Sequence, residues 1–171
     1  MARRVVYSAP TGETFTFDDD WNEADGRVRQ IEYQLEPDKP VPEHRHLSAA
    51  QTFKVLSGTL HVKVNGVVSV LQAGSEARAG PGDAHSQWNE GPEPVKALET
   101  YDPPLAIEPF FSVLPHAIAS GNPLKIAVFR GDFQAASANA TFGQAMFVAV
   151  FGTLGRMFGF GRWYAEYLPN T

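Results

Sequence analysis

The first hundred residues consist of short alternating apolar runs separated by turn residues, and this pattern constrains the fold more than any other feature. Such runs predict β-strands whose alternate side chains face a core. Asn65-Gly66, between two of the runs, is a strong signal for a β-hairpin. The predicted strands are Thr14–Phe17, Arg27–Leu35, Thr52–Leu56, Thr59–Val64, Val67–Leu71, His85–Trp88 and Val95–Tyr101. Many short strands at this spacing favour an antiparallel sandwich or barrel.

The pattern changes after Tyr101–Leu105, where two prolines end the last strand. Residues 107–119 predict a short helix that is bent or ended near Pro115. We therefore predict a β-domain at residues 1–103 and a helical extension at residues 104–171, packed on the barrel or at an oligomer interface. Apolar residues that recur at three- and four-residue steps along one face of a helix support the helical extension. These residues are Met146, Phe147, Val150, Phe151, Leu154, Met157 and Phe158.

The helical extension has no charged residue from Ala135 to Gly155, a run long enough to span a bilayer. Polar residues and glycines interrupt it, however, and its strongly apolar part is only Ala145–Leu154. We expect a helix buried in protein, either against the same chain or in a homodimer. Shallow membrane attachment and a true span are the alternatives. The residues expected to be buried are Met146, Val150, Leu154 and Met157.

Composition narrows the classes of partner and metal site. The formal net charge is -5, and nothing in the sequence resembles the basic face that nucleic acid requires. We expect a small-molecule ligand as the partner and no nucleic acid. The chain has no cysteine, which excludes disulfides and thiolate metal sites. The N-terminal stretch MARRVVYSAPTGETF lacks the apolar core of a signal peptide. We expect a cytoplasmic protein, with peripheral membrane attachment as the alternative.

Two histidines, His44 and His46, alternate with Arg45 and therefore point to the same face of a strand. Two adjacent buried imidazoles are costly without partners, and a divalent cation would provide one, since neutral imidazole suits iron, nickel and zinc. A solvent-facing pair near a loop is the alternative. A glycine-rich turn at residues 80–82 places His85 near the start of another strand. Taken alone, His85 fits a structural histidine.

The two histidine blocks together resemble the paired motifs of the cupin superfamily. The first motif is a Gly, five residues, His-x-His, three or four residues, Glu, six residues and Gly. His44, His46, Gln51 and Gly58 match this spacing. Asp38 replaces the opening Gly, and Gln51 replaces the Glu.

The second cupin motif is a Gly, five residues, Pro-x-Gly, two residues, His, three residues and Asn. Gly74, Gly82, His85 and Asn89 match it, while Gly80 takes the place of the Pro. The resemblance covers roughly residues 28–101. It implies a mainly β protein, a cupin jelly-roll β-barrel followed here by the C-terminal helical extension.

By residue matching, the resemblance implies a divalent metal ion (Fe, Mn, Zn or Ni) held by His44, His46 and His85. The family's Glu is commonly the fourth ligand. Gln51 could ligate through its amide oxygen, orient water or substrate beside the ion, or mark a site that no longer binds metal. A three-histidine site also resembles the iron cupins that include thiol and diketone dioxygenases.

Neighbouring residues on the same strand faces predict a mostly apolar substrate pocket with two amides. Phe53, Val55 and Gln87 are its expected members, and Tyr33 could add a phenol. The predicted function is a cupin-type metal-binding protein, with a metal-dependent dioxygenase acting on a small organic molecule as the candidate enzyme class. The alternative is a non-catalytic small-molecule-binding or assembly module with a degenerate metal site. His61 and His116 receive no role.

Overall fold

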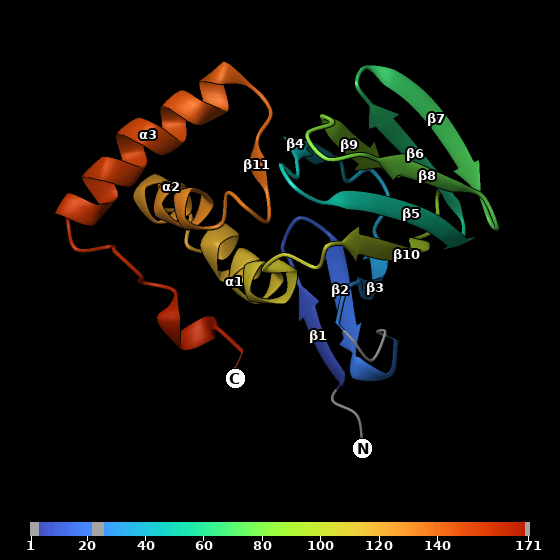
Figure 1. Ribbon diagram of the computed structural model, residues 1–171, viewed down its shortest axis with the longest axis horizontal. Helices are drawn as coiled ribbons and strands as arrows, with labels where there is room; N and C mark the ends of the chain where they lie inside the picture. Colours follow the sequence, from blue (N-terminus) through green and yellow to red (C-terminus); the bar gives the residue numbers. More distant parts are fainter. Residues whose placement is uncertain (1–3, 22–25, 170–171) are drawn as a thin grey trace.

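Within residues 4–21 and 26–169, which the computed structural model describes, the strands form two antiparallel sheets that face each other as a jelly-roll barrel (Figure 1). The strands of the first sheet, in the order in which they pair, are Arg4–Ser8 (β1), Glu13–Asp18 (β2), Arg29–Leu35 (β3), Val95–Asp102 (β10), Ala50–Ser57 (β5) and Glu76–Ala79 (β8). Those of the second sheet are Ala138–Asn139 (β11), Val41–Arg45 (β4), His85–Trp88 (β9), Thr59–Val64 (β6) and Val67–Gln72 (β7). The predicted fold class is confirmed.

The turn between β6 and β7 follows the sequence signal for a hairpin. Asn65 and Gly66 have φ angles of 48° and 84°, and positive φ at both central residues is what a two-residue turn of this hand requires. Asp38, which stands where the family motif has Gly, also has a positive φ of 54°. An Asp tolerates this left-handed conformation better than most residues. The backbone conformation expected at this motif position is therefore present although Asp38 replaces the Gly.

The barrel core consists of the inward-facing residues of both sheets. Along β10, Val95, Ala97, Glu99 and Tyr101 are all buried, as period-two alternation demands. Tyr33, whose facing the sequence left open, is fully buried within the core cluster. Other members of this cluster are Phe15, Phe17, Ile31, Leu35, Phe53, Val55, Leu60 and Val62.

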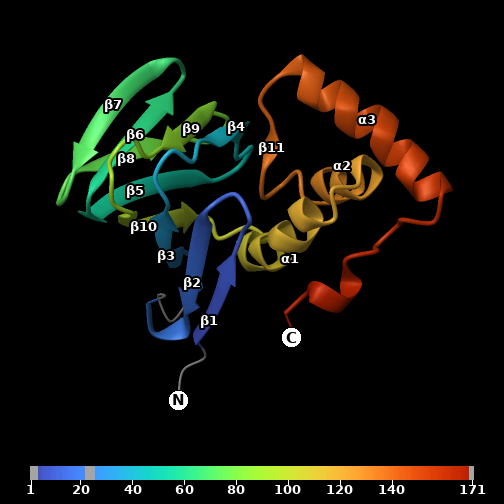
Figure 2. The ribbon, with the colours of Figure 1, turned by 180° about the vertical axis from the view of Figure 1, so that it is seen from behind.

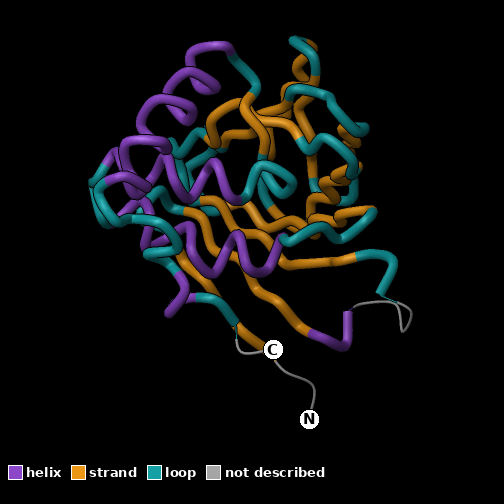
Figure 3. The backbone as a smooth tube through the Cα atoms, turned by 60° about the vertical axis from the view of Figure 1, so that its left-hand side comes forward, coloured by secondary structure: helices purple, strands orange, loops and turns teal. Residues whose placement is uncertain are grey.

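The helices after β10 form a layer on one side of the barrel (Figures 1 and 3). They are Ile107–Ala119 (α1), Pro123–Asp132 (α2) and Phe142–Met157 (α3), followed by a short 3-10 turn at Ala165–Tyr167 (η2). A second 3-10 turn, Asp19–Trp21 (η1), follows β2. Ile107 and Phe111 of α1 belong to the barrel core cluster. The division into two domains at residue 103 stays a prediction.

Helix α1 continues through Pro115 to Ala119, so the expected end or bend at the proline does not shorten it. Proline removes one backbone hydrogen bond, but the neighbouring residues Val113 and Ala117 are buried. Packing therefore holds the last turn in place. Helix α2 was not predicted, although Asn122 caps its first backbone N–H groups and Pro123 starts it, both of which are common N-terminal signals.

Helix α3 packs on α2 through its small residues, which corrects the prediction that its apolar stripe is buried within the chain. Val148, Gly152 and Gly155 are the buried residues of α3. A Cβ at Gly155 would lie 2.9 Å from the carbonyl oxygen of Leu124, so only glycine allows this approach. The opposite face stays exposed, and its members include Met146 (47%), Val150 (46%), Leu154 (38%) and Met157 (77%). Burial of this face in a homodimer stays a prediction.

The C-terminal segment returns from α3 toward α1, and both ends of the described chain lie on the same side of the molecule (Figure 2). The ring of Tyr167 stacks on His116 of α1 with a centroid distance of 3.7 Å. None of the helices formed by the described residues has the length and apolarity that crossing a bilayer requires.

Candidate metal centre

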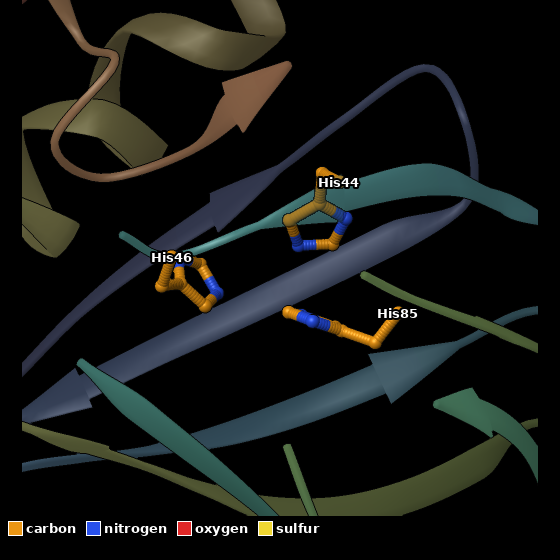
Figure 4. A group of neighbouring side chains, drawn as sticks. All are labelled: His44, His46 and His85. Carbon is orange, nitrogen blue, oxygen red and sulfur yellow. The ribbon is translucent and has the colours of Figure 1, made fainter. Parts of the chain in front are cut away.

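The structure brings His44, His46 and His85 together inside the barrel (Figure 4). His44 lies in β4, His46 just after it, and His85 opens β9. Because β4 and β9 pair with His44 opposite His85, the two motifs meet in one place. The ring centroids lie 4.4 Å (His44–His85), 5.1 Å (His46–His85) and 5.2 Å (His44–His46) apart. One nitrogen of each ring lies within 4.8 Å of the others.

Each of the three imidazoles uses its Nδ1 atom to contact a backbone carbonyl oxygen. Nδ1–H of His44 donates to Pro42 (3.0 Å) and that of His85 to Asp83 (3.0 Å). Nδ1–H of His46 donates to Ala136, in the segment between α2 and β11. A carbonyl can only accept, so the proton of each neutral ring sits on Nδ1 and the lone pair on Nε2. Histidine ligands to metals are usually fixed in this way.

Burial keeps these imidazoles neutral at ordinary pH. The pKa of His85 is lowered to about 4, mainly by burial and in smaller part by His46, while the hydrogen bond to the Asp83 carbonyl opposes the change. Burial also lowers the pKa of His46. It depresses the pKa of His44 well below its usual value, with smaller effects from the other imidazoles and from Arg130. Neutral imidazole is the form that ligates a cation.

Gln51 lies between two of the imidazoles. Its Oε1 is 2.8 Å from Nε2 of His46 and 2.9 Å from Nε2 of His85. With the ring protons on Nδ1, all three atoms bear lone pairs, so they repel one another unless a cation binds among them. An amide turned by 180° would instead donate its N–H groups to the same nitrogens. The position therefore fits a ligand or near neighbour of an ion.

A buried chain of hydrogen bonds leads away from Gln51. Its Nε2 donates to the Tyr101 hydroxyl (2.9 Å), which donates to Oε2 of Glu99 (2.6 Å). Burial raises the pKa of Glu99 to about 8, although the bond from Tyr101 opposes the change. Sequence reasoning missed this carboxyl group. The signal was present, because Glu99 occupies an inward position of β10 between the apolar Ala97 and Tyr101.

The donor set fits a divalent transition metal. His44, His46 and His85 offer neutral Nε2 atoms and Gln51 an amide oxygen, and imidazole suits iron, nickel and zinc. The ligand role of these residues and the identity of the ion stay predictions.

A cavity of about 260 Å³ opens onto His44, His46 and Gln51. Its lining comes from the barrel and from helices α1 and α2, which is more than the sequence predicted. Gln87 is part of this lining, and its contact with a substrate stays a prediction. Gln87 Oε1 and Glu99 Oε1 are buried and have no hydrogen-bond partner among the described residues. The cavity therefore has polar groups that a bound molecule could satisfy.

The other residues expected in the pocket lie in the barrel core. Tyr33, Phe53 and Val55 are fully buried there, and the wall of the cavity is formed by other described residues. Phe53 packs edge-on against His85 with a centroid distance of 6.0 Å, so it supports the ring from behind. Contact of these three side chains with a ligand stays a prediction.

Comparison with known proteins identifies the barrel. A family model described as "Cupin domain" matches residues 31–101. Similar solved structures include the cupin domain of Cnp3 from Schizosaccharomyces pombe, with 15% identity over 58% of this chain and 68% of that chain, at a TM-score of 0.51. KdgF from Halomonas sp. has 14% identity over 58% of this chain and 86% of that chain, at a TM-score of 0.51. No curated protein shows a significant match.

A predicted oxalate decarboxylase from Thermotoga maritima has 19% identity over 60% of this chain and 91% of that chain, at a TM-score of 0.50. At these identities the likeness shows the fold alone. The family model, the jelly-roll topology and the meeting of the two histidine motifs agree. Residues 31–101 of the chain therefore form a cupin domain.

Proposed function

We propose that the chain binds a divalent metal ion through His44, His46 and His85 and uses it to act on a small organic molecule. The observation that carries the proposal is the anchoring of all three Nδ1 atoms on backbone carbonyls. This leaves the lone pair of each ring on Nε2, in a group where one nitrogen of each ring lies within 4.8 Å of the others. A metal-dependent dioxygenase is the candidate enzyme class.

When bound, the ion would supply Lewis-acid chemistry that polarises a substrate or oxygen. The chain's own residues would position the molecule and handle protons. Glu99 holds a proton at neutral pH because of its raised pKa. Tyr101 connects it to Gln51 through bonds of 2.6 and 2.9 Å, so a proton can be stored or exchanged at the edge of the cavity. A carboxyl with a pKa near neutrality suits general acid or base work.

Metal uptake is tested on protein purified with a tag that is removed before analysis. We expect about one equivalent of metal by elemental analysis. Titration of metal-free protein with Fe(II), Mn(II), Zn(II) or Ni(II) should give a Kd that is micromolar or lower. His44→Ala and His85→Ala should lose this binding. His61→Ala and His116→Ala are matched controls outside the site and should keep it. Equal metal binding by all four variants would refute the proposal.

A non-catalytic small-molecule-binding module is the second candidate, and Gln51 favours it. An amide in place of a carboxylate removes a negative charge beside the ion, so the site should hold metal more weakly. Oxygen consumption by Fe(II)-loaded protein, measured with a panel of small thiols, diketones and carboxylic acids, separates the two candidates. Turnover that is lost in Glu99→Gln while metal binding persists supports the enzyme. Ligand binding without turnover supports the module.

A further inference from the structure

The cavity at the imidazoles extends beyond the barrel into the helical extension. Its barrel side carries the polar groups, which include His44, His46, Gln51 and Gln87. Its other side is apolar and comes from α1 and α2, which lie beside the barrel where β11 pairs with β4 (Figure 2). The apolar wall is made by Ile107, Phe110, Phe111, Leu114, Ile118 and Phe129. The helices therefore turn a barrel pocket into a longer, two-sided one.

Arg130 is the cationic residue of this lining. It comes from the last turn of α2 and is half-buried. Its guanidinium donates to Oδ1 of Asn139 (3.2 Å), and Asn139 pairs with His44 across β11 and β4. Arg130 thus belongs to the imidazole end of the cavity. No acidic group within the described ranges forms an ion pair with it.

The acidic residues of the lining do not cancel this charge. Glu43 is paired with Lys63 (2.8 Å). Glu13 accepts a hydrogen bond from Thr11 (2.7 Å) and Glu99 one from Tyr101 (2.6 Å). The guanidinium of Arg130 therefore has no carboxylate partner among the described residues of the lining, and a bound divalent cation would add to its positive charge. The guanidinium of arginine matches the geometry of carboxylates and phosphates, and a carboxylate is the smaller of these two groups.

We propose that the cavity takes an amphiphilic carboxylate, with its carboxylate at the imidazole and Arg130 end and its apolar body between α1 and α2. The assignment of the metal end rests on the proposed function, whereas the apolar half rests on the helices alone. A cavity of 150 Å³ takes benzene, so about 260 Å³ suits a molecule of roughly ten non-hydrogen atoms. Octanoate and 3-phenylpropionate are probes of this class and size.

Calorimetric titration of metal-loaded and metal-free protein tests the proposal with 3-phenylpropionate, its neutral analogue 3-phenylpropan-1-ol, and propionate. We expect 3-phenylpropionate to bind at least tenfold more tightly than either of the others. Arg130→Met should weaken the binding of 3-phenylpropionate at least tenfold and leave the binding of 3-phenylpropan-1-ol unchanged. The matched control is Arg78→Met, which removes an exposed arginine of β8 and should change nothing. Equal binding of acid and alcohol would overturn the charge assignment.

Leu114→Trp tests the apolar half by filling it. This variant should bind 3-phenylpropionate and 3-phenylpropan-1-ol at least tenfold more weakly, while its metal affinity and its melting curve stay close to those of wild type. If this variant loses its fold, Ile118→Phe, a smaller filling, serves in its place. Unchanged binding of 3-phenylpropionate in a folded, filled variant would overturn the proposal. If metal fails to bind while these ligand effects remain in metal-free protein, the proposed function fails and this inference stands.

Discussion

Replacing Gln51 by Glu should tighten metal binding. The substitution places an anionic oxygen where the amide oxygen lies 2.8 Å from His46 and 2.9 Å from His85. The volume hardly changes, so the gain reflects charge. Charged polar interactions exceed neutral ones by about 1–2 kcal/mol, which corresponds to about 5- to 30-fold in Kd.

Glu99 lies close enough to affect the stability of the metal-free variant, and the structure sets the size of the effect. The new carboxylate and Glu99 would both contact the Tyr101 hydroxyl, whose single proton serves only one of them. Their nearest oxygens would lie at most about 5.5 Å apart, the two hydrogen bonds of 2.9 and 2.6 Å laid end to end. Glu99 holds its proton at neutral pH, so the two groups repel only where Glu99 ionises. Two unit charges at that distance repel by about 3 kcal/mol at an effective dielectric constant of 20. Without metal, Gln51→Glu should therefore be less stable than wild type at alkaline pH, above about pH 8.

The assay is titration of metal-free wild type, Gln51→Glu, and Gln51→Glu with Glu99→Gln, using Fe(II) under nitrogen, Mn(II), Zn(II) and Ni(II). The double variant should bind metal about as tightly as Gln51→Glu at neutral pH, because Glu99 is already protonated there and its replacement removes no charge. Gln72→Glu adds the same charge on exposed β7 and is the control. If Gln51→Glu has the same affinity as Gln72→Glu for every metal, position 51 does not face the ion and the reasoning is refuted.

Stability should peak near pH 6.5. As the pH falls from 6.5 toward 4, the unfolded chain takes up protons that His85 and the neighbouring imidazoles do not bind in the folded chain. As the pH rises from 4.5 toward 8, the unfolded chain releases the carboxyl proton that Glu99 keeps in the folded chain, so stability is lost over this range. Urea unfolding between pH 4 and 9 checks this, and Glu99→Gln should remove the alkaline loss. Gly155→Ala should lower the free energy of unfolding by about 1–3 kcal/mol, because its Cβ would lie 2.7 Å from a side-chain atom of α2. Gly143→Ala in the same helix meets nothing within 4 Å and should cost no stability. Chemical denaturation of both variants checks this prediction. The exposed face of α3 repeats apolar residues every four positions from Phe142 to Phe158, so two copies can pack face to face about a twofold axis. We expect sedimentation equilibrium to show a homodimer for wild type and a monomer for Leu154→Asp. A wild-type monomer that co-sediments with lipid vesicles would contradict this prediction.

The barrel was predictable because each of its signals is local. Alternation located the inner face of β10, Asn65-Gly66 located a hairpin, and His44 and His46 had to share a face. Their meeting with His85 followed from the resemblance of the ordered motifs, and not from spacing alone. Strands β1 and β8 were missed because they lie at the edges of the first sheet, where few of their side chains are buried.

The helical extension was less predictable, because its packing depends on tertiary contacts. A stripe of large apolar residues normally marks the buried face of a helix. In α3 the glycines Gly152 and Gly155 allow closer backbone approach to α2, so the opposite face is buried. The part of α1 and α2 in the cavity wall could not be read from the sequence either, since it depends on how the helices dock against the barrel. Glu99 could have been found from alternation alone.

The most direct test of the central claim is anomalous diffraction from crystals grown with Mn(II), Fe(II) or Zn(II), with data collected on both sides of the metal's absorption edge. The account predicts one peak at roughly 2.0–2.2 Å from the Nε2 atoms of His44, His46 and His85, and its absence in His85→Ala. A metal bound elsewhere, bound through Nδ1, or absent from wild-type crystals at saturating concentration would contradict the account.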